Sequence, residues 1–291
     1  MLNRILKIAA VALPVLLLAS CGNGEVHGVS LALTDSPIDI ASSVNISFSQ
    51  VELSGPDVTP TELDIRPAAS VDLYQLQGGL SQTVAGAIQA QPGHYTTLTL
   101  TIVADPSSGQ SSIVLPDGLH ILYIPPGVSS RVQIPVDFDF ASGGDVNLTA
   151  DFDLRKSILP DPNDPTKYQL IPAVRAVINQ QSGNISGEIA TPLVVCLQPA
   201  VYVYQGDVTP TDMDITAAPS RVQPFATALV GLNVTSGRYD FTVGFLPPGE
   251  YTVAYTCDAQ FDIANQANSL HFIKVAHGAV KALVTTFVNM E

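Results

Sequence analysis

The segment VNISFSQVEL, residues 44–53, alternates apolar and polar residues over most of its length. In an extended strand, Val44, Ile46 and Phe48 therefore lie on the same face. The segment YTTLTLTIV, residues 95–103, repeats the alternation. A period of two residues is typical of β-strands that bury one face, so these two segments predict a β-sheet with one side packed on a core.

Similar runs recur along the chain, and short turns rich in Gly and Pro separate them. The runs cover residues 29–34, 132–140, 146–154, 251–255 and 280–288, and the turns include residues 35–37, 105–109, 125–127 and 247–249. Many short strands joined by such turns predict an all-β sandwich architecture. Residues 81–91 are the one segment for which we expect a short helix.

The N-terminus has the pattern of a signal peptide. Arg4 and Lys7 precede an apolar run over residues 8–18, which is too short to cross a bilayer core of about 30 Å. The run ends in Leu-Ala-Ser before Cys21. This pattern resembles the lipobox of bacterial lipoproteins, which implies a diacylglyceryl group on the Cys21 sulfur and cleavage after residue 20. An ordinary secretory signal with an incidental Cys is the alternative.

The charge balance restricts the partners. The chain has 12 Lys plus Arg against 26 Asp plus Glu, for a net charge of −14. Loss of residues 1–20 removes two bases and no acid, which leaves 10 − 26 = −16. Nucleic acid is excluded as a partner, because phosphate binding needs a basic surface. Acyl chains would still hold the protein on a membrane. By the same resemblance, Gly22 favours the outer membrane of the cell envelope.

Two further cysteines, Cys196 and Cys257, lie in strand-like runs. An even pair in an oxidising compartment predicts a disulfide, with two buried free thiols as the alternative. The bridge would close a loop of about 60 residues and stabilise the fold by roughly 3–4 kcal/mol in the chain-entropy account.

The sequence contains an internal repeat. DVTPTELDI at residues 57–65 recurs as DVTPTDMDI at residues 207–215, with seven of nine positions identical. In each half a Pro-Gly-X-Tyr-Thr segment follows, at residues 92–96 and 248–252. We interpret the repeat as two related sandwiches, with chance similarity of β-rich segments as the alternative. After a signal peptide over residues 1–20 and a tether over 21–27, the predicted domains are 28–180 and 185–291.

Both halves resemble known families. Residues 33–37, 43–53, 71–73, 92–95, 151–157 and 168–175 carry, in order, a resemblance to the bacterial and archaeal lipoprotein domain of unknown function 4382. Residues 186–189 and 246–253 resemble a transthyretin-like or carboxypeptidase-regulatory-like sandwich, a carbohydrate-binding-like fold. The resemblances imply two immunoglobulin-like or transthyretin-like antiparallel sandwiches in tandem, and they imply no activity.

Two acidic pairs are the strongest candidates for chemistry. Asp137 and Asp139 flank one Phe, and Asp151 and Asp153 flank another, so each pair shares a face of its strand. If the two strands pair across residues 141–145, the four carboxylates come close and Ca²⁺ would suit them. A solvated or salt-bridged face is the alternative, and a pair of hydrolytic carboxylates is a third interpretation. No calcium-loop pattern of the D-x-[DN]-x-[DN]-G form occurs.

Other residues are weaker candidates. Tyr202 and Tyr204 share a strand face and, with Phe225, would stack on sugars or pack in a core. Asp35, in Thr-Asp-Ser-Pro, is expected to cap a turn through its side chain, with a ligand role as the alternative. The five His are scattered, and no zinc, nucleotide or serine-hydrolase motif occurs.

These observations favour a non-enzymatic lipoprotein of the cell envelope. It would be anchored through its N-terminal lipid and would display sandwich modules to a polysaccharide, a matrix component or another envelope protein. A structural spacer or assembly subunit is the alternative, and a carboxylate-dependent hydrolase is the third. Apart from Ca²⁺, no cofactor is expected.

Overall fold

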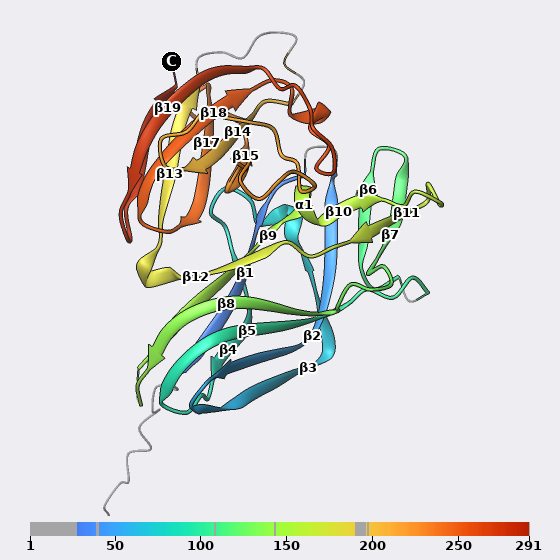
Figure 1. The fold of residues 1–291 in the computed structure, drawn as a ribbon, viewed down its shortest axis with the longest axis vertical. Helices are drawn as coiled ribbons and strands as arrows, with labels where there is room; N and C mark the ends of the chain where they lie inside the picture. The colour runs from blue at the N-terminus through green and yellow to red at the C-terminus, as the bar shows by residue number, and fades with distance from the viewer. Residues whose placement is uncertain are drawn as a thin grey trace, which may run out of the picture.

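The computed structural model describes residues 28–38, 41–107, 109–142, 144–189, 196 and 198–290. The expected signal peptide, Cys21 and the tether lie outside these residues. The described chain is almost entirely β, as the alternating segments predicted, and it forms two sandwiches that stack along the long axis of the molecule (Figure 1).

The described part of the first sandwich contains twelve strands. They are β1 (Val29–Ser36), β2 (Ser43–Gly55), β3 (Val58–Asp72), β4 (Gln82–Ile88), β5 (Gly93–Val103), β6 (Ser112–Leu115), β7 (Gly118–Tyr123), β8 (Arg131–Phe140), β9 (Val146–Asp153), β10 (Ile158–Pro160), β11 (Lys167–Leu170) and β12 (Val174–Ile178). One sheet has the order β12-β9-β1-β4, and the other has the order β10-β11-β7-β6-β2-β5-β8 with β3 beside β2. A single turn of helix, α1 (Leu154–Ser157), follows β9.

In the residues that the structure describes, the second sandwich contains eight strands in two four-stranded sheets. They are β13 (Gly183–Ile189), β14 (Ala200–Gln205), β15 (Ala226–Leu229), β16 (Gly231–Asn233), β17 (Arg238–Leu246), β18 (Gly249–Thr256), β19 (Phe272–Val280) and β20 (Thr285–Met290). The sheet orders are β16-β17-β13-β20 and β15-β14-β18-β19.

The helix expected over residues 81–91 is wrong. This segment forms β4, which pairs antiparallel with β1 and buries Ala85 and Ile88. Backbone pairing with β1 and burial of these two side chains outweigh a weak helical preference. The sheets are also not wholly antiparallel, because β1 pairs with β9, β13 with β20 and β11 with β7 in parallel.

The two sandwiches share one pairing scheme. In the first, β1 pairs with β4 and β9, β2 pairs with β3 and β5, and β5 pairs with β8. In the second, β13 pairs with β17 and β20, β14 pairs with β15 and β18, and β18 pairs with β19. Parallel and antiparallel pairs agree at every step. This agreement supports the interpretation of the repeat as two related sandwiches.

The first sandwich carries additions to this common scheme. β6 and β7 lie between β5 and β8 in sequence, and with β10 and β11 they extend one sheet to the side of the molecule (Figure 1). β12 is added to the other sheet as its outer strand. Both α1 and β12 follow the last common strand, β9, and side chains of both reach backbone carbonyls of the second sandwich.

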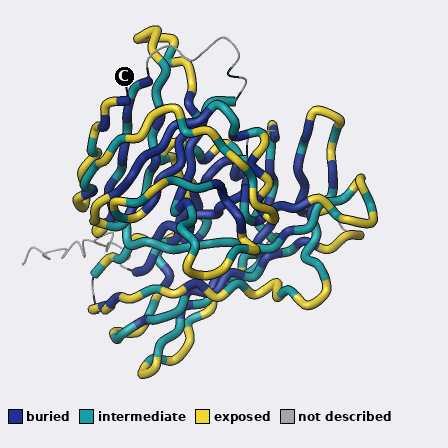
Figure 2. Tube along the Cα trace, turned by 45° about the horizontal axis from the view of Figure 1, so that its top comes forward, coloured by how far each residue is buried: buried dark blue, intermediate teal, exposed yellow. Residues whose placement is uncertain are grey.

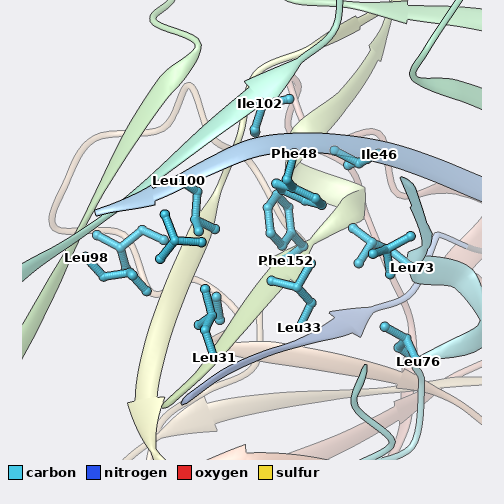
Figure 3. Close-up of a cluster of buried hydrophobic side chains, with 14 of the residues drawn as sticks. Leu31, Leu33, Ile46, Phe48, Leu73, Leu76, Leu98, Leu100, Ile102 and Phe152 are labelled. Atoms are coloured by element: carbon cyan, nitrogen blue, oxygen red, sulfur yellow. The ribbon is translucent and has the colours of Figure 1, made fainter. Parts of the chain in front are cut away.

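Each sandwich has its own core. Phe48 of β2 and Phe152 of β9 meet edge to face between the two sheets of the first, with ring centroids 5.7 Å apart (Figure 3). The first core runs from Val29 to Leu170, and the second from Ile185 to Met290. Buried segments form the interior of both halves, while exposed residues concentrate in the turns (Figure 2).

The repeated Pro-Gly-X-Tyr-Thr segments have the same structure. Gly93 and Gly249 open β5 and β18 with φ of +154° and +157°, a conformation that favours glycine. The fully buried Tyr95 donates a hydrogen bond from its hydroxyl to the Gln91 carbonyl at 2.9 Å, and Tyr251 donates to the Pro247 carbonyl at 2.8 Å. Each tyrosine thus ties the start of a core strand to the preceding turn, four residues back.

Candidate functional site: the cleft between the sandwiches

A cleft of about 590 Å³ lies where the two sandwiches meet. The first sandwich contributes β1, β9, α1 and the start of β12 with the residue before it, and the second contributes the end of β14 and the segments that follow it. Its lining comprises Ser36, Asp151, Asp153, Lys156, Ala173, Val174, Arg175, Tyr204, Gln205, Val208, Val222, Gln223, Pro224 and Phe225. Charged groups line one wall, and mainly apolar and amide groups line the other.

Three basic side chains of the first sandwich reach backbone carbonyls of the second. Arg155 Nη1 donates to the Ala259 oxygen at 2.8 Å, Lys156 Nζ donates to the Pro224 oxygen at 2.8 Å, and Arg175 Nη1 donates to the Phe245 oxygen at 2.6 Å. Hydrogen bonds from charged donors are stronger than neutral ones. These contacts therefore join the sandwiches across the cleft.

Acids of β9 hold two of these bases in place. Asp151 forms an ion pair with Arg175, and Asp153 forms one with Lys156, whose Nζ lies 2.7 Å from Asp153 Oδ2. Asp153 also accepts from the Lys156 backbone N–H at 3.0 Å, which caps α1. The cap also explains the ion pair, because the helical turn brings residue i+3 back over the end of β9.

The carbonyl that Arg175 reaches lies on a distorted part of β17. Phe245 has φ of +55°, and the pairing of β17 with β13 shifts in register beside it. Its backbone N–H donates to Asn184 Oδ1 at 3.2 Å, and its carbonyl receives Arg175. The Arg175 guanidinium also lies over the Phe225 ring, 4.5 Å from its centroid. A backbone distortion therefore provides one of the contacts between the sandwiches.

Apolar contacts accompany the charged ones. Met213, which is fully buried, packs with Leu159 and Ile171 of the first sandwich and with Ala264 of its own half. Met213 belongs to the second copy of the nine-residue repeat. One of the repeated segments is thus part of the contact between the sandwiches.

The acids at this contact are unusually placed. Burial raises the pKa of Asp35 well above its usual range, and the nearby charges of Asp151 and Asp153 raise it further, against a lowering contribution from the Leu154 N–H. Burial also raises the pKa of Asp151, although its ion pair with Arg175 lowers it. Three carboxyl groups are therefore crowded where the solvent cannot stabilise them.

The expected pairing of the two acidic strands is wrong. β8, which holds Asp137 and Asp139, pairs with β5, whereas β9 pairs with β1 and β12 in the opposite sheet. Asp137 and Asp139 are exposed and lie beside His94, whose ring nitrogens are 3.6 and 3.1 Å from their oxygens. The chain crosses between sheets after β8, so the four carboxylates do not gather. Within the described ranges, no three or more His, Cys, Asp or Glu side chains are grouped to hold a metal ion.

For Tyr202 and Tyr204 the structure shows the core alternative. Both are fully buried, pack on Phe272 and donate to Asp262 and to the Thr211 carbonyl. The prediction for Asp35 is wrong. Asp35 caps no turn, because it lies within β1 and is buried.

Cys196 and Cys257 form a disulfide with a Cα–Cα distance of 5.0 Å. Both sulfurs lie 3.4 Å from the Tyr255 hydroxyl. The bond joins the segment before β14 to the end of β18. It therefore holds the entry to the second sandwich against one of its central strands.

The basic residues of the contact were not predicted as functional. Arg155 and Lys156 stand directly after the acidic pair in Asp-Phe-Asp-Leu-Arg-Lys, which suggested only local charge neutralisation. Arg175 lies about twenty residues further on, in strand β12. Nothing in their spacing shows that they point at another domain, because that depends on where the second sandwich lies.

The fold and the cleft define an all-β protein of two joined sandwiches. Residues 28–172 match the family described as Domain of unknown function (DUF4382). This match confirms the resemblance seen in the first half, and it ends before β12. No curated protein matches the chain. None of the helices in the described part of the chain has the length and apolar character that a membrane crossing requires.

Solved structures give only distant similarities. The minor pilin of Streptococcus agalactiae has 10% identity and a TM-score of 0.21, with 91% of this chain and 95% of that chain covered. The major pilin of Streptococcus pyogenes has 10% identity and a TM-score of 0.19, with 91% and 98% covered. At these scores neither protein informs the function.

Proposed function

We propose that the protein is a non-enzymatic lipoprotein of the cell envelope that is anchored through Cys21 and binds a glycan or matrix polymer in the cleft between its sandwiches. The cleft is the observation that supports this proposal. Its volume of about 590 Å³ lies within the usual range of ligand pockets, and ligand sites often form at domain contacts.

The lining suits a polar polymer with apolar faces. Ion pairs keep the carboxylates of Asp151 and Asp153 and the bases of Arg175 and Lys156 in fixed positions, which limits the entropy lost on binding. Gln205 adds an exposed amide at the end of β14. Hydroxyl groups of a sugar can donate to carboxylates and amides and accept from amides and bases.

Affinity electrophoresis of the chain from Gly22 onward, through gels that contain bacterial and plant polysaccharides, tests the proposal. We expect at least one polysaccharide to retard the protein. Gln205→Ala should weaken the retardation, whereas Gln266→Ala, an exposed amide on another loop, should leave it unchanged. Retardation that is equal in both variants would place binding outside the cleft, and none on any polymer would remove the glycan proposal.

A spacer or assembly subunit is the second candidate. The hydrogen bonds from Arg155, Lys156 and Arg175 support this role, as does the packing around Met213. Together they join the two sandwiches at several separate places. If no polymer retards the protein, crosslinking in cells followed by identification of the attached envelope proteins tests this role. Absence of any crosslinked partner would contradict the assembly role.

A further inference from the structure

The charged side chains of the cleft between the sandwiches balance one another. Among the described residues that line it, Asp151 and Asp153 are the acids and Lys156 and Arg175 are the bases. Each base forms an ion pair with one acid, Arg175 with Asp151 and Lys156 with Asp153. The formal charge of the lining is therefore zero, in a chain whose net charge is −14.

Both bases are also held by contacts with the second sandwich. The Lys156 ammonium donates to the Pro224 carbonyl. The Arg175 guanidinium donates to the Phe245 carbonyl and lies over the Phe225 ring. Since the side chains of Lys156 and Arg175 are only 19% and 22% exposed, an anionic group would have to displace a partner from a largely buried base. The described lining thus offers an anionic ligand no uncompensated cation.

The paired bases still have hydrogen-bonding capacity for an uncharged ligand. An ammonium has three N–H donors, and Lys156 has two oxygen partners, on Asp153 and Pro224. A guanidinium has five donors, and Arg175 likewise has two oxygen partners. A hydroxyl group can accept from a remaining donor without breaking the ion pair, because it brings no charge that needs a counterion.

The other wall is mainly apolar. The second sandwich contributes Val208, Val222, Pro224 and Phe225, and Gln205 adds an exposed amide at the end of β14. Sites for small organic ligands combine apolar surface with a few placed polar groups in this way. An uncharged sugar chain presents the matching surfaces, since its pyranose rings have apolar C–H faces and hydroxyl edges.

We propose that the cleft selects uncharged polysaccharides and rejects polymers that carry carboxylate or sulfate groups. This selectivity rests on the glycan binding proposed above. Hydroxyl groups bond to the balanced wall, and C–H faces pack on the apolar wall. Acidic polymers are disfavoured for two reasons, because each base of the lining is already paired and because the net charge of −14 repels them.

Affinity electrophoresis of the chain from Gly22 onward tests the selectivity with polymers that share a backbone and differ in charge. The pairs are hydroxyethyl cellulose with carboxymethyl cellulose, dextran with dextran sulfate, and methyl-esterified pectin with polygalacturonate. For at least one pair, we expect the neutral polymer to bind at least about tenfold more tightly than the acidic one. Raising NaCl from about 50 mM to about 500 mM should change binding of the neutral polymer less than about twofold, because salt screens only charged contacts.

Asp153→Asn tests whether charge balance is the cause, because it leaves Lys156 without its acid. Asparagine is as good an N-cap as aspartate, so α1 keeps its cap. The variant should bind the acidic polymer of the pair about tenfold more tightly than the unsubstituted chain does. Asp139→Asn makes the same change of charge at an exposed site outside the cleft and should give no gain.

Gln205→Lys is a second variant, at an exposed position where folding is not at risk. It adds an uncompensated cation to the cleft and should also increase binding of the acidic polymer, whereas Gln266→Lys, on another loop, should not. Unchanged acidic-polymer binding in both Asp153→Asn and Gln205→Lys would overturn the role of charge balance.

The outcomes separate this selectivity from glycan binding itself. Retardation of the unsubstituted chain by acidic polymers alone, or equally by both members of every pair, would overturn the selectivity and leave glycan binding intact. No retardation by any polymer would instead remove the proposed function, and the selectivity with it.

Discussion

The two copies of the nine-residue repeat adopt different structures at corresponding places in the two sandwiches. Residues 57–65 form a regular part of β3, paired with β2, with mostly exposed or half-buried side chains. Residues 207–215 form no strand, and their Asp212, Met213 and Asp214 are buried. Seven identical residues in nine therefore do not determine a common local structure.

The residues just before each copy account for the difference. Pro56 and Asp57 make a two-residue turn, so Val58 pairs back with Gly55 and the hairpin closes at once. Proline at this position favours a tight turn. The second copy follows Gly206 with no such proline, and the Gly206 N–H donates to the Glu250 carbonyl at 2.7 Å. The chain is thereby directed along β18 instead of back along β14.

Tertiary surroundings, more than intrinsic propensity, therefore decide whether a short β-rich segment forms a strand. Leu63 in the first copy packs at the margin of its own core, while Met213 at the same place in the repeat packs on the other sandwich. The same apolar position thus stabilises a single sandwich in the first copy and the contact between the two sandwiches in the second.

The largest difference in stability cost between the two copies should appear at the apolar position that Leu63 and Met213 occupy. Met213→Ala removes a fully buried side chain and should lower the free energy of unfolding by about 3 kcal/mol. Leu63→Ala, at a half-buried site, should cost about 1 kcal/mol. Urea unfolding measures both. Equal losses would show that the two copies contribute alike and would break the comparison.

The acidic residue just before this apolar position, Glu62 or Asp212, should show a smaller difference in stability cost between the two copies. Asp212 pairs with Arg221 and accepts from the Asn268 N–H, so Asp212→Asn should cost about 2 kcal/mol. Glu62 is exposed and accepts only a 3.2 Å bond from Gln50, so Glu62→Gln should change stability by less than about 0.5 kcal/mol. Chemical denaturation of the two variants gives the values. A cost for Glu62→Gln as large as that for Asp212→Asn would contradict this account.

Tyr95 and Tyr251, from the two Pro-Gly-X-Tyr-Thr segments, should contribute equally to the free energy of unfolding. Tyr95→Phe and Tyr251→Phe each remove one buried hydroxyl bond to a carbonyl four residues back, and each should cost about 1 kcal/mol. Similar values would show that this motif, unlike the nine-residue copies, keeps its role in both sandwiches. A difference above about 1 kcal/mol between the two would show that the motif has diverged as well.

The sequence predicted much of the fold because its signals are local. Alternation in residues 44–53 and 95–103 identified β2 and β5, since a strand with one buried face needs a period of two. Pro-Gly before Tyr95 and Tyr251 identified the turns, because positive φ restricts the residue choice. Residues 81–91 were wrongly expected to be helical, because their small apolar residues suit either state until β1 pairs with them.

The candidate site was far less predictable, because it depends on contacts between distant residues. The sequence by itself determined strands β2, β5, β8 and β9, the shared turn motif and the two Cys that form a disulfide, all of which follow from side-chain period or residue type. The expected run over 280–288 is wrong in its middle, because residues 281–284 turn between β19 and β20. Only the tertiary structure decided that Asp151 joins Arg175 instead of Asp137, and that Lys156 reaches the Pro224 carbonyl of the second sandwich. Sheet partners and domain contacts arise from packing over long separations, which no local pattern in the chain encodes.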